Sequence, residues 1–182
     1  DRRQRQMCIR DRRSTIIVKK IKVSYNIKWK IVRRGEIFMK LYIGCDHGGL
    51  DLKNVLITYL KEQGHEITDV GTYTYDSCDY PVYAKQVAEA VRDKKCDRGI
   101  VICSTGIGVS IVANKVKGVR CALVTDVTTA RLTREHNDTN CLALGQKNVS
   151  YDRAKEIADI WLATPFSNGE RHKRRISMIE EE

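Results

Sequence analysis

The sequence has no apolar run long enough to cross a membrane and no leader with an apolar core. It has no C-x-x-C pair, and no group of His, Cys, Asp and Glu has zinc-like spacing. We therefore expect neither a membrane protein nor a metalloprotein. Cysteine itself is not scarce, and residues such as Cys45, Cys121 and Cys141 lie in or at the end of apolar runs. Reduced cysteines pack in this way as small hydrophobic side chains, so we expect a cytoplasmic protein.

Net charge is absent from most of the chain. The formal charge of the 182 residues is +10. Residues 1–38 hold 13 Lys or Arg against 3 Asp or Glu, whereas residues 39–182 hold 20 of each sign. Residues 39–182 therefore need no nucleic acid or membrane to balance their charge, and we expect neither as a partner.

The basic segment 1–38 has three interpretations. It could be an arm that binds nucleic acid, or an organelle presequence, because it is rich in Arg and poor in acidic residues. We favour a third, in which it is not native protein, because DRRQRQMCIRDRR resembles translated sequencing-adapter read-through. The stretch that follows it is basic and β-prone, and Met39 then precedes a clean strand. We expect residues 1–38 to be non-native or disordered and residues 39–182 to form the domain.

From residue 40 onward, short continuous apolar runs alternate with segments of helical periodicity. The pattern predicts strands at 40–45, 65–70, 98–103, 119–124 and 140–145. It predicts helices at 50–63, 81–94, 107–115, 126–137, 151–163 and 169–180. Strands that alternate with helices indicate a single α/β domain, a Rossmann-like three-layer sandwich with a five-stranded parallel sheet. We expect the strand order 2-1-3-4-5.

Two predicted strands end in residues that can do chemistry. The first is followed by Asp46 and His47 before a Gly-Gly pair, and the third ends in VICSTGIG, with Cys103 at its tip. Ligands of open α/β sheets bind beyond the carboxyl ends of strands, where the strand order reverses. The expected order therefore places Asp46 and His47 beside Cys103.

The glycines after Cys103 allow backbone N–H groups to converge at a helix N-terminus, a geometry that binds an anion or oxyanion. The same helix end lowers the pKa of a nearby thiol. Such a site suits proton abstraction beside a carbonyl or nucleophilic attack. This local pattern fits a packed structural cysteine equally well.

Other glycine-loop chemistries fit this stretch less well. A Walker A loop requires a Lys after its second glycine, and none follows Gly108. A dinucleotide fingerprint requires a third glycine where Ile111 stands. A cysteine phosphatase loop requires an Arg where Val109 stands.

The other polar candidates lie later in the chain. His136 and Asn137 stand where a predicted helix breaks, a place where a histidine is often a cap or a surface residue. Arg171 and Arg175 are four residues apart, so they share a helix face and could grip a phosphate. The alternative for this basic run is a solvated helix face.

Residues 39–182 resemble the ribose-5-phosphate isomerase B family, which includes galactose-6-phosphate isomerase subunits. Matching motifs occur in family order across essentially the whole domain. They are GCDHGG (44–49), DVGT (69–72), DYP (79–81), VICSTGIGVSIVANKVKGVR (101–120), REHNDTN (134–140) and GERHKRR (169–175). The resemblance implies interconversion of ribose 5-phosphate and ribulose 5-phosphate through an enediolate, in the pentose phosphate pathway and without metal or other cofactor. Segment 1–38 has no counterpart in it.

The resemblance also implies roles for individual residues. Cys103 would be the base that moves a proton between C1 and C2, with Thr105 assisting at the hydroxyl oxygens. His136 would open the sugar ring, helped by Asp46. The backbone of Ser104, Gly106, Ile107 and Gly108 would stabilise the enediolate.

The resemblance further implies that His47, Arg171 and Arg175 hold the phosphate, with His172 nearby as a further substrate-binding residue. Tyr80 and Asn137 would line the sugar site. The family builds this site between two subunits, so a homodimer or a dimer of dimers is expected.

One residue departs from the family pattern. The usual C-G-T-G reads C-S-T-G here, so Ser104 replaces a glycine. If the φ of Ser104 is negative, the substitution costs little, and we expect that. Two alternatives to the pentose reaction stay open at this point. They are the same chemistry on galactose 6-phosphate or allose 6-phosphate, and nucleic-acid binding through the basic segment.

Overall fold

The structure is a computed structural model that describes residues 10–11, 14–23, 26–33 and 38–181. The chain divides into two compact units, Asp1–Phe38 and Met39–Glu182. Whether residues 1–38 are non-native or disordered stays a prediction. Residues 1–9, 12–13, 24–25 and 34–37 lie outside the described residues.

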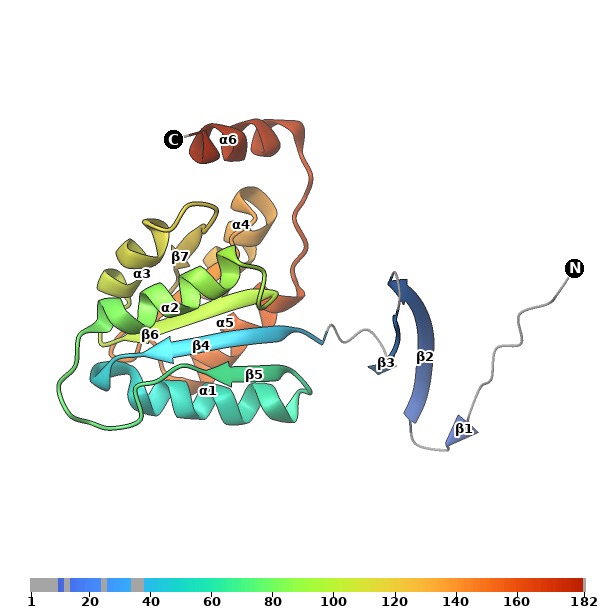
Figure 1. The fold of residues 1–182 in the computed structure, drawn as a ribbon, viewed down its shortest axis with the longest axis horizontal. Coiled ribbons are helices and arrows are strands. Elements are labelled where there is room, and N and C mark those ends of the chain that lie inside the picture. Colours follow the sequence, from blue (N-terminus) through green and yellow to red (C-terminus); the bar gives the residue numbers. More distant parts are fainter. Residues whose placement is uncertain (1–9, 12–13, 24–25, 34–37, 182) are drawn as a thin grey trace, which may run out of the picture. The chain divides into compact units, whose positions relative to one another are not determined.

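The first unit contains an antiparallel sheet in the order β1-β2-β3 (Figure 1). Its strands are β1 (Arg10–Asp11), β2 (Ser14–Val23) and β3 (Asn26–Arg33). The long pair runs in register from Ile16↔Arg33 to Val23↔Asn26. These two strands cover most of the stretch that the sequence marks as β-prone.

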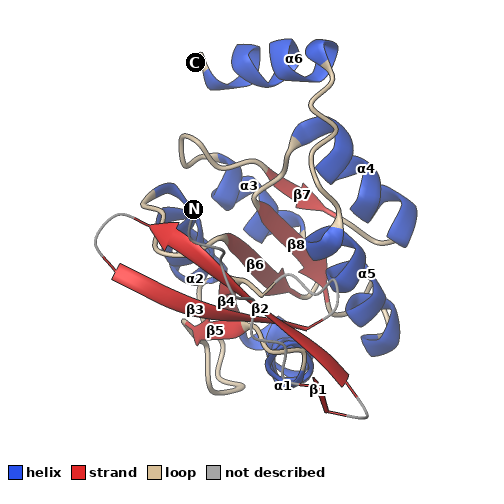
Figure 2. Cartoon of the chain, turned by 90° about the vertical axis from the view of Figure 1, so that its right-hand side faces the viewer, coloured by secondary structure: helices blue, strands red, loops and turns tan. Residues whose placement is uncertain are grey.

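The second unit is the predicted three-layer α/β sandwich (Figure 1, Figure 2). Its parallel strands are β4 (Lys40–Cys45), β5 (Glu66–Asp69), β6 (Arg98–Cys103), β7 (Cys121–Leu123) and β8 (Cys141–Gly145). Its helices are η1 (His47–Gly49), α1 (Leu50–Glu62), α2 (Tyr80–Arg92), α3 (Ile107–Asn114), α4 (Val127–Asn137), α5 (Tyr151–Ala163) and α6 (Glu170–Glu180). No helix in residues 38–181 combines the length and the apolar character needed to cross a bilayer.

The expected strand order was wrong at one edge. The observed order is β5-β4-β6-β8-β7, which is 2-1-3-5-4 in chain order. The last strand, β8, is buried along its whole length and takes the place beside β6, whereas the three residues of β7 are only half-buried at the edge. A short, partly exposed strand is suited to an edge, and two apolar runs of similar length could not be ranked by composition. The reversal between β4 and β6 lies where it was expected.

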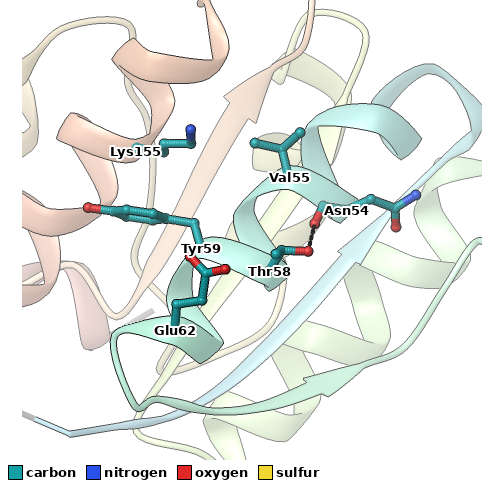
Figure 3. A pocket seen from close by; sticks show the side chains of 6 residues that line it. All are labelled: Asn54, Val55, Thr58, Tyr59, Glu62 and Lys155. Atoms are coloured by element: carbon teal, nitrogen blue, oxygen red, sulfur yellow. Dashed lines mark hydrogen bonds between the residues drawn. The ribbon is translucent and has the colours of Figure 1, made fainter.

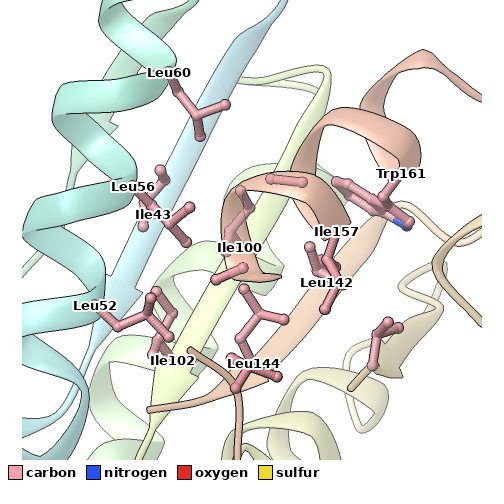
Figure 4. Packing of buried hydrophobic residues seen from close by; sticks show 14 of the residues in the cluster. Ile43, Leu52, Leu56, Leu60, Ile100, Ile102, Leu142, Leu144, Ile157 and Trp161 are labelled. Carbon is pink, nitrogen blue, oxygen red and sulfur yellow. The ribbon is translucent and has the colours of Figure 1, made fainter. Parts of the chain in front are cut away.

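Alternate residues of the central strands pack against the two helical layers, as the two-residue period of a strand requires. On one face, Ile43, Ile100 and Leu142 contact a cluster that includes Leu56 of α1 and Trp161 of α5 (Figure 4). On the other face, strand residues pack against α2 and α3, and Cys103 belongs to this second cluster. The strands are buried on both faces because helices cover both.

Local signals explain where several helices begin and end. Pro81 lies in the first turn of α2, where its missing N–H costs nothing. Gly64 has φ +91°, and the His65 N–H donates to the Leu60 carbonyl, so the chain leaves α1 through a left-handed glycine. Asp126 and Ser150 accept backbone hydrogen bonds as N-caps of α4 and α5.

We expect a chain that begins at Met39 to fold as well as the full chain, because residues 39–162 supply both of the core clusters described above. Urea unfolding followed by circular dichroism would give closely similar midpoints for the two chains. Loss of a cooperative transition in the shorter chain would show that residues 1–38 belong to the fold.

Candidate active site

The carboxyl ends of β4 and β6 are held in contact by two glycines. The Asp46 N–H donates to the Ile102 carbonyl at 3.3 Å. A Cβ on Gly49 would lie 2.9 Å from the backbone of Ile102, and one on Gly48 would lie 2.1 Å from the hydroxyl of Ser104. The turn after β4 therefore packs directly on the turn after β6, as predicted for Asp46, His47 and Cys103.

Cys103 is buried at the tip of β6 and receives a backbone hydrogen bond. The Gly106 N–H donates to the Cys103 Sγ at 3.0 Å. This geometry requires a left-handed residue at Gly106, whose φ is +77°, and any Cβ there would lie 2.5 Å from Leu123. Helix α3 starts at Ile107, and the N–H groups of its first turn have no acceptor within the helix. The loop thus combines a thiol with backbone donors.

Ser104 fits without strain. It is not among the non-glycine residues of the described chain that have positive φ, so the expected negative φ is confirmed. Its side chain occupies the space that Gly48 leaves free. The next residue, Thr105, is exposed, and its carbonyl accepts from Asn148 Nδ2 at 2.9 Å.

The segment between β5 and α2 completes this edge of the sheet. The Cys78 N–H donates to His47 Nδ1 at 3.2 Å, which leaves Nε2 of His47 for other partners. The ring of Tyr80 lies against Gly108, because a Cβ on Gly108 would lie 2.7 Å from it. His47 and Tyr80 therefore lie at the Cys103 loop, where the resemblance places them.

Asp46 is buried, and its Oδ1 has no hydrogen-bond partner. Burial raises the pKa of its carboxyl group, although the nearby His47 opposes the shift. An unsatisfied buried carboxylate costs stability, so it is a feature of a binding site more than of a structural core. The neighbouring thiol of Cys45 is different: burial raises its pKa to about 12, which keeps it neutral.

The sequence analysis missed a buried cation behind this edge. Lys53 has no exposed surface, and its Nζ donates to both Asp69 oxygens at 2.8 and 2.9 Å and to the Thr72 carbonyl at 2.6 Å. The Thr72 N–H in turn donates to the Cys45 carbonyl at 2.7 Å. A signal existed, because Lys53 is in helical phase with the buried Leu56 and Leu60.

Two residues after β8 also belong to this edge and were missed. The Gln146 N–H donates to the Cys103 carbonyl at 2.9 Å, and its Oε1 accepts from the Leu52 N–H at 2.9 Å. The Lys147 N–H donates to the Ser104 carbonyl at 2.9 Å, and its side chain is exposed. Their position just past the end of a parallel strand was the available signal.

The other predicted site residues form a second cluster on α4 and α6. His136 and His172 stack with ring centroids 4.5 Å apart and planes at 7°. Arg171 Nε lies 3.3 Å from His172 Nε2. Asn137 ends α4, and its carbonyl accepts from Arg120 Nε at 2.9 Å. Arg175 lies one helical turn after Arg171 on α6.

Within one chain, the two clusters lie at opposite ends of the parallel strands. Cys103 is at the carboxyl end of β6, whereas Arg120, which contacts Asn137, directly precedes the amino end of β7. The strands are parallel, and the six residues of β6 span about 17 Å. The structure therefore brings together Asp46, His47, Tyr80 and the Cys103 loop, and it holds the second cluster apart from them.

A shallow groove on α1 and α5 contains none of the predicted site residues (Figure 3). Its wall includes Tyr59, which donates to Asp159 Oδ2 at 2.5 Å. This hydrogen bond is the main reason that the pKa of Tyr59 is raised to about 12. Among residues 38–181, no group of three His, Cys, Asp or Glu side chains is placed to hold a metal ion.

Known proteins match the second unit. The family model described as Ribose/Galactose Isomerase matches residues 41–179. The chain belongs to this family. Ribose-5-phosphate isomerase B of Escherichia coli is 45% identical over 140 residues, covering 77% of this chain and 93% of that protein.

Solved structures of the same family match the fold. Ribose-5-phosphate isomerase B of Clostridium thermocellum aligns with a TM-score of 0.77 at 51% identity, covering 79% of this chain and 96% of that chain. The Mycoplasma genitalium enzyme, solved with bound ribulose-5-phosphate, aligns with a TM-score of 0.75 at 40% identity, covering 78% and 94%. The family and the α/β fold implied by the sequence motifs are confirmed.

Replacing Asp46 with Asn should stabilise the fold, because a neutral amide costs less to bury than a carboxylate with one unpartnered oxygen. Since the pKa of Asp46 is raised, the native state binds this proton more tightly than the unfolded chain. Stability from this residue therefore falls as pH rises from the unfolded to the native pKa. The free energy of unfolding in urea should increase by about 1 kcal/mol near pH 8 and by less near pH 4. An Asp46→Asn chain less stable at both pH values would contradict this account.

Proposed function

We propose that the chain is an aldose–ketose isomerase that interconverts ribose 5-phosphate and ribulose 5-phosphate. The observation that carries the proposal is the hydrogen bond from the Gly106 N–H to the Cys103 Sγ, at the edge where β4 and β6 meet. This hydrogen bond holds the sulfur beside the backbone N–H groups that begin α3, so a base and donors for a negative oxygen lie in one loop. Membership of the family and its ribose-5-phosphate isomerase B relatives support this substrate.

The Cys103 thiolate takes the proton from C2 of the open-chain aldose, and the electron pair of the C–H bond forms the enediolate. The thiol then returns the proton to C1, while Thr105 assists the proton shift between the two oxygens. Backbone N–H groups from Ser104 to Gly108 stabilise the negative oxygen in the transition state. No atom is lost or gained, so the reaction needs no oxidant, and the proposal includes no metal or cofactor.

The proposed binding roles follow the two clusters. His47 directs Nε2 toward the phosphate, since the Cys78 N–H occupies Nδ1. Tyr80 lines the sugar site beside Gly108, and Asp46 assists at the ring oxygen. From the second cluster, His136 opens the furanose ring, Asn137 lines the sugar site, and Arg171 and Arg175 hold the phosphate.

A homodimer with shared sites is part of the proposal. The two clusters lie at opposite ends of the strands of one sheet. They are too far apart for a single sugar phosphate to touch both. Helices α2 and α3 expose the apolar side chains of Tyr80, Val82, Ile107 and Ile111, and the ring of Tyr80 lies against Gly108 in the Cys103 loop. A second copy that covers these side chains would bring its own α4 and α6 to the loop. The resemblance to a family with sites between subunits supports this arrangement.

The proposed location is the cytoplasm, where six free cysteines of the described chain would stay reduced. The six-carbon alternative has one specific observation in its favour, because the matching family model covers galactose isomerases too. Parallel assays with galactose 6-phosphate and allose 6-phosphate separate it from the pentose reaction. The other alternative is nucleic-acid binding through residues 1–38. Residues 39–182 do not support it, because their acidic and basic residues are equal in number.

We expect the protein to convert ribose 5-phosphate to ribulose 5-phosphate in the presence of EDTA. Cys103→Ser should reduce kcat by about a thousandfold or more, because a serine hydroxyl is far less acidic than a thiol and cannot serve as the base near neutral pH. Its fold and its affinity for inorganic phosphate should be unchanged, as judged by urea unfolding and competitive inhibition. Near wild-type turnover in this variant would exclude Cys103 as the base.

Mixing two inactive variants tests the shared site. Cys103→Ser removes the base from one cluster, and His136→Ala removes the ring-opening group from the other. After joint refolding in equal amounts, half of the dimers contain both variants, and each such dimer has one intact site. The mixture should therefore regain about a quarter of wild-type activity. If each subunit used only its own residues, the mixture would stay inactive.

A further inference from the structure

His172 contacts the proposed ring-opening residue and is placed unlike a phosphate ligand. Its side chain is 9% exposed, and its ring lies parallel to that of His136 at a centroid distance of 4.5 Å. Gly169 makes room for it, because a Cβ there would lie 3.1 Å from His172 Cδ2. The face of the imidazole is therefore used for packing against His136.

The Nε2 atom of His172 also has a partner. Arg171 Nε donates to His172 Nε2 at 3.3 Å, so this nitrogen carries a lone pair and the ring is neutral. Burial is the main cause that lowers the pKa of His172, with further contributions from His136, Arg171 and Arg175. A neutral ring offers a phosphate dianion no positive charge, and with Nε2 accepting from Arg171 its one remaining donor is the Nδ1 proton.

The stack joins two elements that are also held together at other points. At the far end of α6, Arg120 Nη1 donates to Glu180 Oε1, while Nη2 of the same guanidinium donates to the Asp138 carbonyl at 2.8 Å. The loop before α6 contacts α4 through the Ser167 N–H, which donates to the Glu135 carbonyl at 3.2 Å. These contacts tie both ends of α6 to the end of α4, and His172 between them lies against His136.

We propose that His172 is a positioning residue, which orients the imidazole of His136 for ring opening by stacking on it and does not bind the phosphate. This inference rests on the proposed function, in which His136 is the ring-opening group. His136 is the penultimate residue of α4 and is only half-buried, so its ring could otherwise occupy several rotamers. A parallel neighbour selects one ring plane and leaves the nitrogens at the edge for the sugar.

A partial reaction separates ring opening from the enediolate step. Ribose 5-phosphate is mostly cyclic and must be opened. Ribulose 5-phosphate has no ring to open, because the oxygen that would close a furanose on C2 carries the phosphate. Exchange of its C1 proton with deuterium from the solvent needs only the enediolate step, so a defect in ring opening reduces turnover of ribose 5-phosphate far more than this exchange.

The experiment compares His172→Ala, which removes the ring, with His172→Phe, which keeps a flat ring that cannot bind phosphate. Forward kcat/KM of the Ala variant should fall by roughly tenfold or more. Its rate of deuterium exchange into C1 of ribulose 5-phosphate and its inhibition constant for inorganic phosphate should stay within about twofold of wild type. The Phe variant should recover the forward rate to within about threefold. His172→Leu fills the same space without a flat face and should resemble the Ala variant, which covers the case that the Ala variant does not fold.

Different failures have different signatures. If His172 binds phosphate, both Ala and Phe variants will raise the inhibition constant for phosphate and lose turnover and deuterium exchange together, and the proposal is overturned. Equal forward losses in Ala, Leu and Phe variants would also overturn it, because ring planarity would then have no role. If the wild type isomerises neither a pentose nor a hexose phosphate, the proposed function fails, independently of His172.

Discussion

The candidate site depends on the pairing of β4 with β6. Their parallel register, which ends at Cys45↔Ile102, brings two turns together at one edge of the sheet. After β4 the chain continues toward β5 on one side of the sheet, and after β6 it continues toward β7 and β8 on the other side. A crevice can therefore form only at this reversal. Gly48 and Gly49 allow the first turn to approach the second closely enough for Ser104 to fit. Without that approach, the thiol of Cys103 and the carboxyl group of Asp46 would not share a site.

Behind the crevice, polar contacts hold the turns that form it. The buried ammonium of Lys53 joins α1 to the segment after β5, and Gln146 joins the carbonyl of Cys103 to the start of α1. A buried ion pair contributes little net stability, but breaking it leaves an uncompensated charge, so it restricts the arrangement of its surroundings. Asp46 lacks such compensation, since its Oδ1 has no partner in the protein. The polar groups behind the site thus have their hydrogen-bond partners, whereas a carboxyl oxygen within the site has none. A site prepared for a polar ligand requires both features.

The second cluster shows how a parallel fold distributes chemistry. Each helix that follows a strand runs back toward the amino ends of the strands. Residues at the end of α4 therefore cannot reach the loop after β6 in the same chain. His136 and Arg171 are nevertheless arranged together by the stack with His172 and by the contacts of Arg120. In the homodimer proposed above, the second cluster of one subunit would face the Cys103 loop of the other.

By itself, the sequence determined the alternation of strands and helices and the glycine-rich turns with polar residues at the ends of β4 and β6. These features follow from periodicity and from backbone constraints within a few residues, which act whatever the rest of the chain does. The tertiary structure alone decided that β8 and not β7 lies beside β6, because both are short apolar runs and only packing ranks them. It also decided that Lys53 is buried and that His136 stacks on His172. The same is true of the position of these histidines, at the opposite ends of the strands from Cys103. Such contacts join residues distant in sequence, and no local pattern specifies which distant partner a side chain will meet.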